Sequence, residues 1–359
     1  MLPSRGGRAL TRVTIAGLPL DRRIALAAGR AGFGEVLAAG SMSDTAASAS
    51  CRIVALAGHV VPQTAWLRAL LAMPLRPETL YVDPGAVAVI DTQYSDRVLD
   101  AAARCGAPEN LADALNGTTR VVRGPLEPSG RFVLSGPADV RAAETWLLRS
   151  LIKPSEGFMS RHVERRISLA VTRRLARTGI TPNTMTLISV GLGLAGAPFF
   201  LAAGPLQILG ALLFLTHSVL DGCDGEIARL KFQETRGGAV LDFWGDNLVH
   251  VAVFAGMTMG WHLATGGAWP LVLGAVTIAS ALATATIASR RFIGGATVDL
   301  ASPVARVAEA LSHRDFIYLI LALALFGKAW WFLAASAVGT PSFLVLLLVL
   351  GGRGTARRP

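Results

Sequence analysis

Four aspartates at the edges of apolar stretches could together hold metal ions. Asp221 and Asp224 are three residues apart and Asp242 and Asp246 are four apart, so each pair would share one face of a helix. Long runs without Asp, Glu, Lys or Arg precede the first pair and follow the second. Carboxylates beside such runs are costly, and cations make their convergence tolerable. Because oxygen ligands favour Mg²⁺, Mn²⁺ or Ca²⁺, we expect two facing helices with a divalent-metal site between them.

The residues around the aspartates follow a longer pattern, Asp-x2-Asp-Gly-x2-Ala-Arg-x8-Gly-x3-Asp-x3-Asp, in which each fixed position is met between Asp221 and Asp246. This pattern resembles the signature of the CDP-alcohol phosphotransferase (CDP-alcohol phosphatidyltransferase) family. The likeness to the membrane part of that family covers roughly residues 150 to 350. It implies an enzyme in which a CDP-alcohol donor and an acceptor hydroxyl give a phosphodiester and CMP.

The resemblance also implies roles for single residues. Asp221, Asp224 and Asp242 are expected to hold two ions of Mg²⁺ or Mn²⁺, which would make CMP a better leaving group. Asp246 is expected to be the general base on the acceptor hydroxyl and also to touch a metal. The residues expected to bind the CDP moiety are Gly225, Ala228, Arg229, Gly238, Pro182 and Asn183. The two glycines lack a Cβ and would let a flat cytosine approach the backbone, whereas the Pro-Asn pair equally suits a plain helix start.

Residues 1–150 are typical of a soluble α/β domain. Short strands are expected at 11–18, 35–39, 52–56, 86–91 and 131–135. Because they alternate with helices, such as Asp21 to Ala31, they predict a mainly parallel sheet. In outline this domain resembles the nucleotidyltransferase domain of the di-myo-inositol phosphate phosphate synthases within the family. The phosphate-cradling Gly-x-Gly-x-Arg is missing after Leu26–Gly29, so we expect a degenerate relative without cytidylyltransferase activity.

Residues 151–180 predict a basic amphipathic helix in the membrane interface. An apolar residue recurs every fourth position from Met159 to Leu175, and arginines fill much of the rest. One reading is anchorage to anionic lipid. The sharper reading is that arginines hold an acceptor phosphate, and the candidates for this are Arg161, Arg165, Arg290 and Arg291.

The remainder of the chain predicts an all-α integral membrane domain, 181–352, followed by a basic tail, 353–359. The chain is 52% hydrophobic with a mean hydropathy of +0.50. Six transmembrane helices are expected near 183–203, 206–230, 237–262, 269–290, 313–327 and 329–350. Arginines gather in one loop and in the tail, and positively charged loops lie on the cytoplasmic side of a membrane. We therefore expect a protein of the cell (inner) membrane whose tail, aspartates and N-terminal domain are cytoplasmic. The first twenty residues lack a sustained apolar core, so no signal peptide is expected.

The net charge of +10 suits a lipid bilayer and anionic substrates, and no motif supports nucleic acid as a partner. The resemblance leaves the substrates open between CDP-inositol with inositol phosphate and CDP-diacylglycerol with a polar alcohol. It also implies a homodimer. A different class, an ion or proton transporter using intramembrane carboxylates, remains an alternative, although a transporter has no use for the Gly-x2-Ala-Arg spacing. The N-terminal domain could be a binding or scaffold module, and the sequence does not decide whether Glu226 faces the site or the lipid headgroups.

Overall fold

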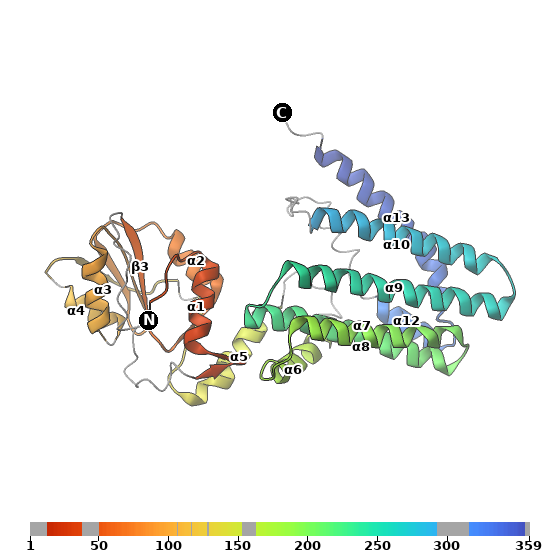
Figure 1. Ribbon diagram of the computed structural model, residues 1–359, viewed down its shortest axis with the longest axis horizontal. Helices are drawn as coiled ribbons and strands as arrows, with labels where there is room; N and C mark the ends of the chain where they lie inside the picture. Colours follow the sequence, from red (N-terminus) through yellow and green to blue (C-terminus); the bar gives the residue numbers. More distant parts are fainter. Residues whose placement is uncertain are drawn as a thin grey trace. The chain divides into compact units, whose positions relative to one another are not determined.

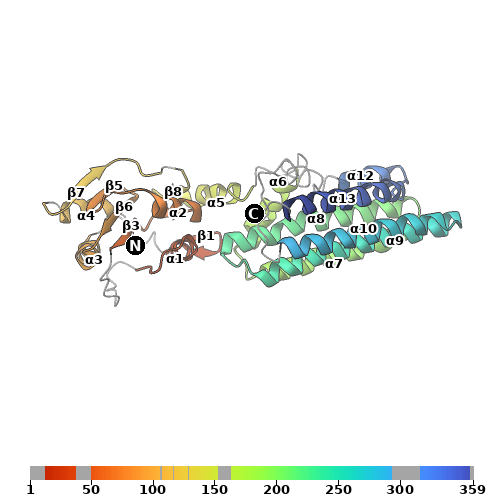
Figure 2. The same ribbon diagram turned by 90° about the horizontal axis from the view of Figure 1, so that it is seen from above.

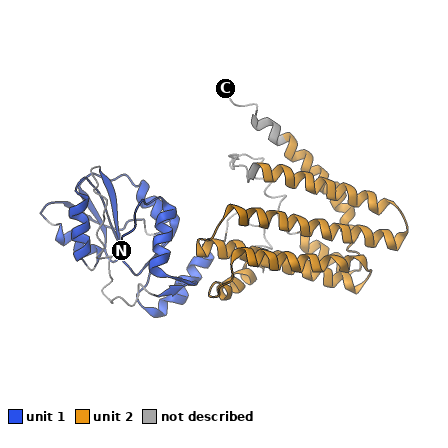
Figure 3. Cartoon of the chain, in the orientation of Figure 1, with its two compact units in different colours: residues 1–149 blue, residues 150–359 orange. Residues whose placement is uncertain are grey.

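The computed structural model describes residues 13–37, 50–105, 107–115, 117–127, 129–152, 163–292 and 316–355. The chain divides into two compact units, Met1–Arg149 and Ser150–Pro359 (Figure 3). The first contains strands and helices, and the second contains helices (Figures 1 and 2). Each unit is described by itself below.

The first unit is built on a four-stranded sheet with the order β3-β6-β5-β7. These strands are β3 Cys51–Leu56, β5 Thr79–Asp83, β6 Val87–Thr92 and β7 Arg120–Arg123. β6 pairs antiparallel with β3 and with β5, and only the pairing of β5 with β7 is parallel among these strands. The prediction of a mainly parallel sheet is therefore wrong. The physical reason is a tight turn at Gly85, whose φ of 75° lets β5 and β6 form a hairpin instead of a crossover.

The other elements of this unit correct some predicted boundaries. They are β1 Thr14–Ile15, β2 Leu18–Pro19, α1 Leu20–Ala31, β4 Val60–Pro62, α2 Thr64–Ala72, α3 Ser95–Arg104, α4 Pro108–Ala114, β8 Arg131–Val133, the 3-10 turn η1 Pro137–Asp139 and α5 Val140–Arg149. The strand expected at 11–18 is instead a small hairpin, because Ala16 and Gly17 both have positive φ. Residues 35–37 form no strand, and 38–39 lie outside the described residues.

The core of this unit lies between the sheet and helices α3 and α4. Side chains such as Leu80 and Ile90 from the strands pack against Val98 and Leu111 from these helices. α1 and α2 lie on the other side of the sheet (Figure 1). Arg52 ties α2 to the sheet, because its guanidinium binds both carboxylate oxygens of Asp91 at 2.6 Å and donates to carbonyls at the end of α2. The unit therefore has its own apolar core and its own half-buried ion pair.

A buried arginine, Arg23, and a buried glutamate, Glu144, join α1 and α5 to the β1–β2 hairpin. The Arg23 side chain is 2% exposed and donates to the Ile15 carbonyl at 2.9 Å. Glu144 of α5 accepts a hydrogen bond from the Ala16 N–H at 3.0 Å. Burial lowers the pKa of Arg23 to about 10, against the opposing effect of the Glu144 charge. Polar contacts thus hold the last helix of the unit onto its first strands.

The second unit is a set of long helices. They are α6 Arg165–Leu175, α7 Pro182–Gly196 with its 3-10 continuation η3 Ala197–Leu201, α8 Pro205–Lys231, α9 Arg236–Thr265, α10 Trp269–Phe292, α12 Phe316–Leu325 and α13 Trp331–Thr355. Five segments of the described chain are long and apolar enough to cross a membrane, and these are Pro182–Leu201, Pro205–Lys231, Arg236–Thr265, Trp269–Arg290 and Trp331–Val349. The further span expected at 313–327 is described only as the ten-residue helix α12, which is shorter than the roughly 20 residues a span needs.

Helix ends follow local sequence signals. The Thr181 side chain caps α7 by accepting from the Thr184 N–H at 3.2 Å, and Pro182 occupies the first turn. Thr235 caps α9 in the same way, accepting from the Gly238 N–H at 3.0 Å. α8 ends where Phe232 adopts a left-handed conformation with a φ of 57°. The tight link from α8 to α9 brings the end of one helix and the start of the next to the same end of the bundle.

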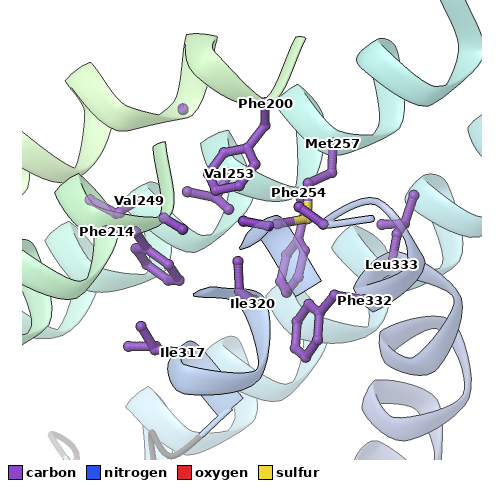
Figure 4. Close-up of a cluster of buried hydrophobic side chains, with 14 of the residues drawn as sticks. Phe200, Phe214, Val249, Val253, Phe254, Met257, Ile317, Ile320, Phe332 and Leu333 are labelled. Atoms are coloured by element: carbon purple, nitrogen blue, oxygen red, sulfur yellow. The ribbon is translucent and has the colours of Figure 1, made fainter. Parts of the chain in front are cut away.

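The core of this unit joins α7, α8, α9, α12 and α13 (Figure 4). Phe200 and Phe214 lie between the first helices, and Phe254 stacks on Phe332 with ring centroids 6.3 Å apart. Gly256 and Gly260 let α9 approach η3 so closely that an added Cβ would collide with the carbonyl oxygens of Ala197 and Phe200. This packing fixes α9 beside α7 and so fixes where its aspartates point.

Candidate metal centre

Three of the four predicted aspartates converge between α8 and α9. One carboxylate oxygen from each of Asp221, Asp242 and Asp246 lies within 4.8 Å of the others. Asp221 and Asp246 are 6% and 8% exposed, and Asp242 is half-buried. α7 packs against both α8 and α9 and so holds the two helices on either side of the carboxylates. The structure therefore brings together residues that the sequence places on two separate helices.

Asp224 has a different environment from the other three. Its Oδ2 accepts a short hydrogen bond from the Thr186 hydroxyl of α7, and its Oδ1 accepts one from the Gly225 N–H. Asp224 is 5% exposed, and Thr186 is 2% exposed. A hydrogen bond from a neighbouring helix fixes the rotamer of a carboxylate and leaves its remaining lone pairs directed elsewhere. Thr186 was missed by the sequence analysis because it lies 38 residues before Asp224 and belongs to no pattern.

His217 lies beside the carboxylate group. Its Nε2 is 3.6 Å from Oδ1 of Asp246, and its Nδ1 is 3.0 Å from the Ser189 carbonyl oxygen. The His217 side chain is 2% exposed and stacks on Phe214 with centroids 6.0 Å apart. A ring fixed on two sides can hold Asp246 in one orientation. His217 of α8 thus contacts both of the neighbouring helices, α7 through Ser189 and α9 through Asp246.

The residues expected at the nucleotide lie at the same end of the bundle. A Cβ added at Gly238 would lie 2.9 Å from Oδ1 of Asn183, so the start of α7 touches the start of α9 at this glycine. A Cβ added at Gly225 would lie 3.2 Å from Nη1 of Arg229, which folds back over the helix. Ala228 is 9% exposed on α8 and Pro182 begins α7. Both N-termini offer partial positive charge, which favours anionic groups such as phosphates.

The donor set fits a hard divalent cation. All converging ligand atoms are carboxylate oxygens, the ligands that Mg²⁺ and Mn²⁺ prefer. Oδ1 of Asp242 is buried and, among the described residues, accepts no hydrogen bond. Carboxylates this close repel one another, and a cation between them removes that repulsion. Asp221, Asp242 and Asp246 are therefore the residues that could hold a metal ion, with Asp224 beside them.

The four candidate acceptor arginines have different positions. Arg165 lies on α6, where its Nη1 is 2.7 Å from the carboxylate of Glu226 on α8. Arg290 is exposed near the end of α10. Arg291 lies in the same helix, but its side chain lies outside the described part of the chain, as does all of Arg161. Among these arginines, the side chains that the structure describes are those of Arg165 and Arg290, and Arg165 contacts the helix that carries Asp221 and Asp224.

Comparison with known proteins agrees with this arrangement. Residues 179–342 match the family described as CDP-alcohol phosphatidyltransferase. This segment is a CDP-alcohol phosphatidyltransferase domain. It contains the four aspartates and the helices α7 to α9 that position them. The family resemblance inferred from the spacing of the aspartates is thereby confirmed.

Several named relatives share part of the chain. A bifunctional IPC transferase and DIPP synthase from Rubrobacter xylanophilus is 37% identical over 144 residues, which are 40% of this chain and 33% of that protein. The protein of the same name from Aquifex aeolicus is 29% identical over 234 residues, 64% of this chain and 53% of that protein. The chain thus spans about a third to a half of the length of the curated relatives it matches. A structure of Mycobacterium tuberculosis phosphatidylinositol phosphate synthase with CDP-DAG bound aligns with a TM-score of 0.36 at 23% identity, over 51% of this chain and 94% of that chain.

Proposed function

We propose that this chain is a metal-dependent membrane transferase that moves a phospho-alcohol group from a CDP-alcohol to an acceptor hydroxyl and releases CMP. The observation that carries the proposal is the convergence of Asp221, Asp242 and Asp246 inside a CDP-alcohol phosphatidyltransferase domain. Asp224, held by Thr186, lies next to them on α8. Carboxylates in such numbers suit a reaction whose donor carries a pyrophosphate and needs cations to neutralise it.

Each side chain then has a task in the transfer. Asp221, Asp224 and Asp242 would hold Mg²⁺ or Mn²⁺, expected as two ions, whose charge would neutralise the pyrophosphate of the donor and favour release of CMP. Asp246, oriented by His217, takes the proton from the acceptor hydroxyl as that oxygen attacks the phosphorus. Gly225, Ala228, Arg229, Gly238, Pro182 and Asn183 receive the CDP moiety at the cytoplasmic end of the bundle.

For the substrates we propose inositol-phosphate chemistry, which the names of the two bifunctional relatives favour. A CDP-diacylglycerol donor is the second candidate, and the phosphatidylinositol phosphate synthases among the relatives favour it, at 36% identity over 100 residues. The acceptor in either case is a polar or phosphorylated alcohol. We also propose that α12 is a sixth membrane helix. The active site and the first unit would then face the cytoplasm. The first unit would be a degenerate nucleotidyltransferase-like domain.

The direct test is incubation of purified protein, in lipid vesicles with Mg²⁺ or Mn²⁺, with CDP-inositol plus inositol phosphate or with CDP-diacylglycerol plus inositol phosphate. Release of CMP with one donor and not the other identifies the donor class. A protein that releases no CMP with either donor, but that moves protons or cations across the vesicle membrane, would contradict the proposal and favour the transporter alternative.

A further inference from the structure

Glu226 is a fully buried acid in the middle of the aspartate motif. Its side chain is 0% exposed although it lies two residues after Asp224. At about 100° per residue, Glu226 projects from α8 about 140° away from Asp221, so it lies outside the carboxylate group. The sequence leaves open whether Glu226 faces the site or the lipid headgroups. In the structure it does neither, because it faces α6.

Three side chains of α6 donate hydrogen bonds to this carboxylate. Arg165 Nη1 and Ser168 Oγ each donate to Oε1 at 2.7 Å, and Thr172 Oγ1 donates to Oε2 at 2.6 Å. These partners are three and four residues apart, which places them on one face of the helix. Ser168 and Thr172 are 2% and 0% exposed. Both oxygens of Glu226 are therefore satisfied by a helix that lies 54 to 61 residues earlier in the chain.

Two neighbouring contacts show that α6 is packed closely onto this side of α8. The Cys223 side chain is 0% exposed, and its Sγ lies 3.5 Å from the Ser168 carbonyl oxygen. A Cβ added at Gly222 would lie 3.1 Å from Nη1 of Arg165. The guanidinium thus lies over the residue that follows Asp221. One side of α8 holds the aspartates, and the other holds α6.

We propose that Glu226 is a positioning residue for the transfer reaction: its carboxylate docks α6 on α8 and thereby fixes the Arg165 guanidinium beside the start of the aspartate motif, where it serves the anionic acceptor. A buried carboxylate without donors is strongly unfavourable, so docking of α6 is the state in which Glu226 is stable. In this docked state the Arg165 guanidinium lies over Gly222, the residue next to Asp221, so its position depends on Glu226.

The docking is tested without any activity measurement by thiol labelling. In a Cys51→Ser, Cys105→Ser background, Cys223 is the sole thiol and lies under α6. We expect a water-soluble maleimide to label it slowly in the parent and at least about tenfold faster in Glu226→Gln, since a charged hydrogen bond of this kind is worth a tenfold to hundredfold change in an equilibrium. Asp100→Asn removes an exposed carboxylate of the first unit and should leave the rate unchanged.

A second variant separates docking from the change of charge. Ser168→Ala with Thr172→Val removes two donors from α6, keeps Glu226 ionisable and alters no charged residue. It should also speed labelling, and its effect should not add to that of Glu226→Gln, because both remove the same contact. Labelling as slow as in the parent in both variants, with the fold retained, would overturn the docking role.

The kinetic part rests on the proposed transfer reaction. Glu226→Gln should raise the KM for the acceptor about tenfold or more while binding of Mn²⁺ and of CDP, measured directly, stays within about twofold, because the aspartates lie on the other side of α8. If Glu226→Gln speeds labelling of Cys223 but leaves the acceptor KM unchanged, the role in acceptor binding is overturned, and the docking of α6 by Glu226 is still supported. If the parent releases no CMP at all, the transfer proposal fails, and the labelling still decides whether Glu226 docks α6.

Discussion

At the scale of single residues, the carboxylate group depends on side chains from α7 and α8 that do not belong to the aspartate motif. Thr186 binds Asp224, and His217 lies 3.6 Å from Asp246. Neighbours of this kind set the orientation of metal-binding carboxylates and tune their affinity. They also explain why the first turn of α7 must lie against α8.

Thr186→Val keeps the shape of the side chain and removes the hydroxyl that binds Asp224. We expect the affinity for Mn²⁺ to fall about tenfold, in the lower part of the range typical for loss of such a partner. The measurement is Mn²⁺ titration of purified protein by calorimetry. Thr216→Val is the matched control, because the Thr216 hydroxyl is exposed and donates to the Leu212 carbonyl of its own helix. Equal affinities in the two variants would show that Asp224 needs no support from α7.

Gly238→Ala tests the junction of α7 with α9. The added methyl would lie 2.9 Å from Oδ1 of Asn183, so the asparagine must move, and we expect weaker binding of CDP with little change in Mn²⁺ affinity. Gly237→Ala is the control, because a Cβ there meets nothing within 4 Å. CDP binding can be followed by fluorescence competition in the presence of Mn²⁺. Should Gly238→Ala bind CDP as tightly as Gly237→Ala, this end of the bundle is not the nucleotide site.

The aspartates could be found from sequence because their chemistry and their spacing coincide within one short stretch. Thr186 and the partners of Glu226 could not, because each contact joins residues far apart in the chain. The structure also adds a second reason for Gly238. The sequence suggests room for a cytosine ring, and the packing shows that a Cβ at this position would also approach Oδ1 of Asn183 to 2.9 Å.

At the scale of elements, α6 has a buried face that its periodic pattern does not reveal. The apolar stripe predicts contact with a membrane interface, and two of its residues, Val163 and Ile167, are 40% and 49% exposed. The buried face is formed by Ser168 and Thr172, which bind Glu226. Hydrophobic periodicity cannot detect a face that is buried for its hydrogen bonds. The exposed apolar stripe fits the predicted contact with a membrane interface, which stays a prediction.

The apolar runs of the sequence predict where the long helices lie. They do not predict which glycines allow these helices to pack closely, such as Gly256 and Gly260. Gly260→Ala should force α9 away from the Phe200 carbonyl and lower the thermal midpoint in detergent, at a cost of about 1–3 kcal/mol. Gly339→Ala is the control, because a Cβ there has open space. A midpoint unchanged from the parent in both variants would mean that α9 and η3 do not approach as closely as the structure has them.

At the scale of the whole molecule, the chain forms two compact units, each with its own apolar core. The first has a mixed sheet that alternation of strands and helices could not predict, since the β5–β6 hairpin depends on a local turn and not on periodicity. The second has the membrane helices and the candidate site. A boundary near Arg149 follows from the contacts within each unit.

Expressed alone, residues 1–149 should be soluble and unfold in one cooperative transition, because the core of strands, α3 and α4 lies wholly within them. The same fragment should make no CDP-alcohol from CTP and an alcohol phosphate, since the Gly-x-Gly-x-Arg is missing. Circular dichroism on heating and chromatography of CTP products check the two statements. A non-cooperative melt would contradict the first, and formation of a CDP-alcohol would contradict the second.

The central claim is that the carboxylates between α8 and α9 hold the metal that the transfer needs, and Asp242→Asn tests it most directly. Asp242 belongs to the converging group, and asparagine keeps its shape while removing its charge. The measurement is Mn²⁺ binding together with CMP release from the CDP-alcohol, in the variant and in Asp113→Asn, which alters an exposed acid of the first unit. We expect Asp242→Asn to weaken Mn²⁺ binding and to slow CMP release, each by at least about a hundredfold, and Asp113→Asn to leave both unchanged. Mn²⁺ binding and CMP release near the parent level in Asp242→Asn would contradict it.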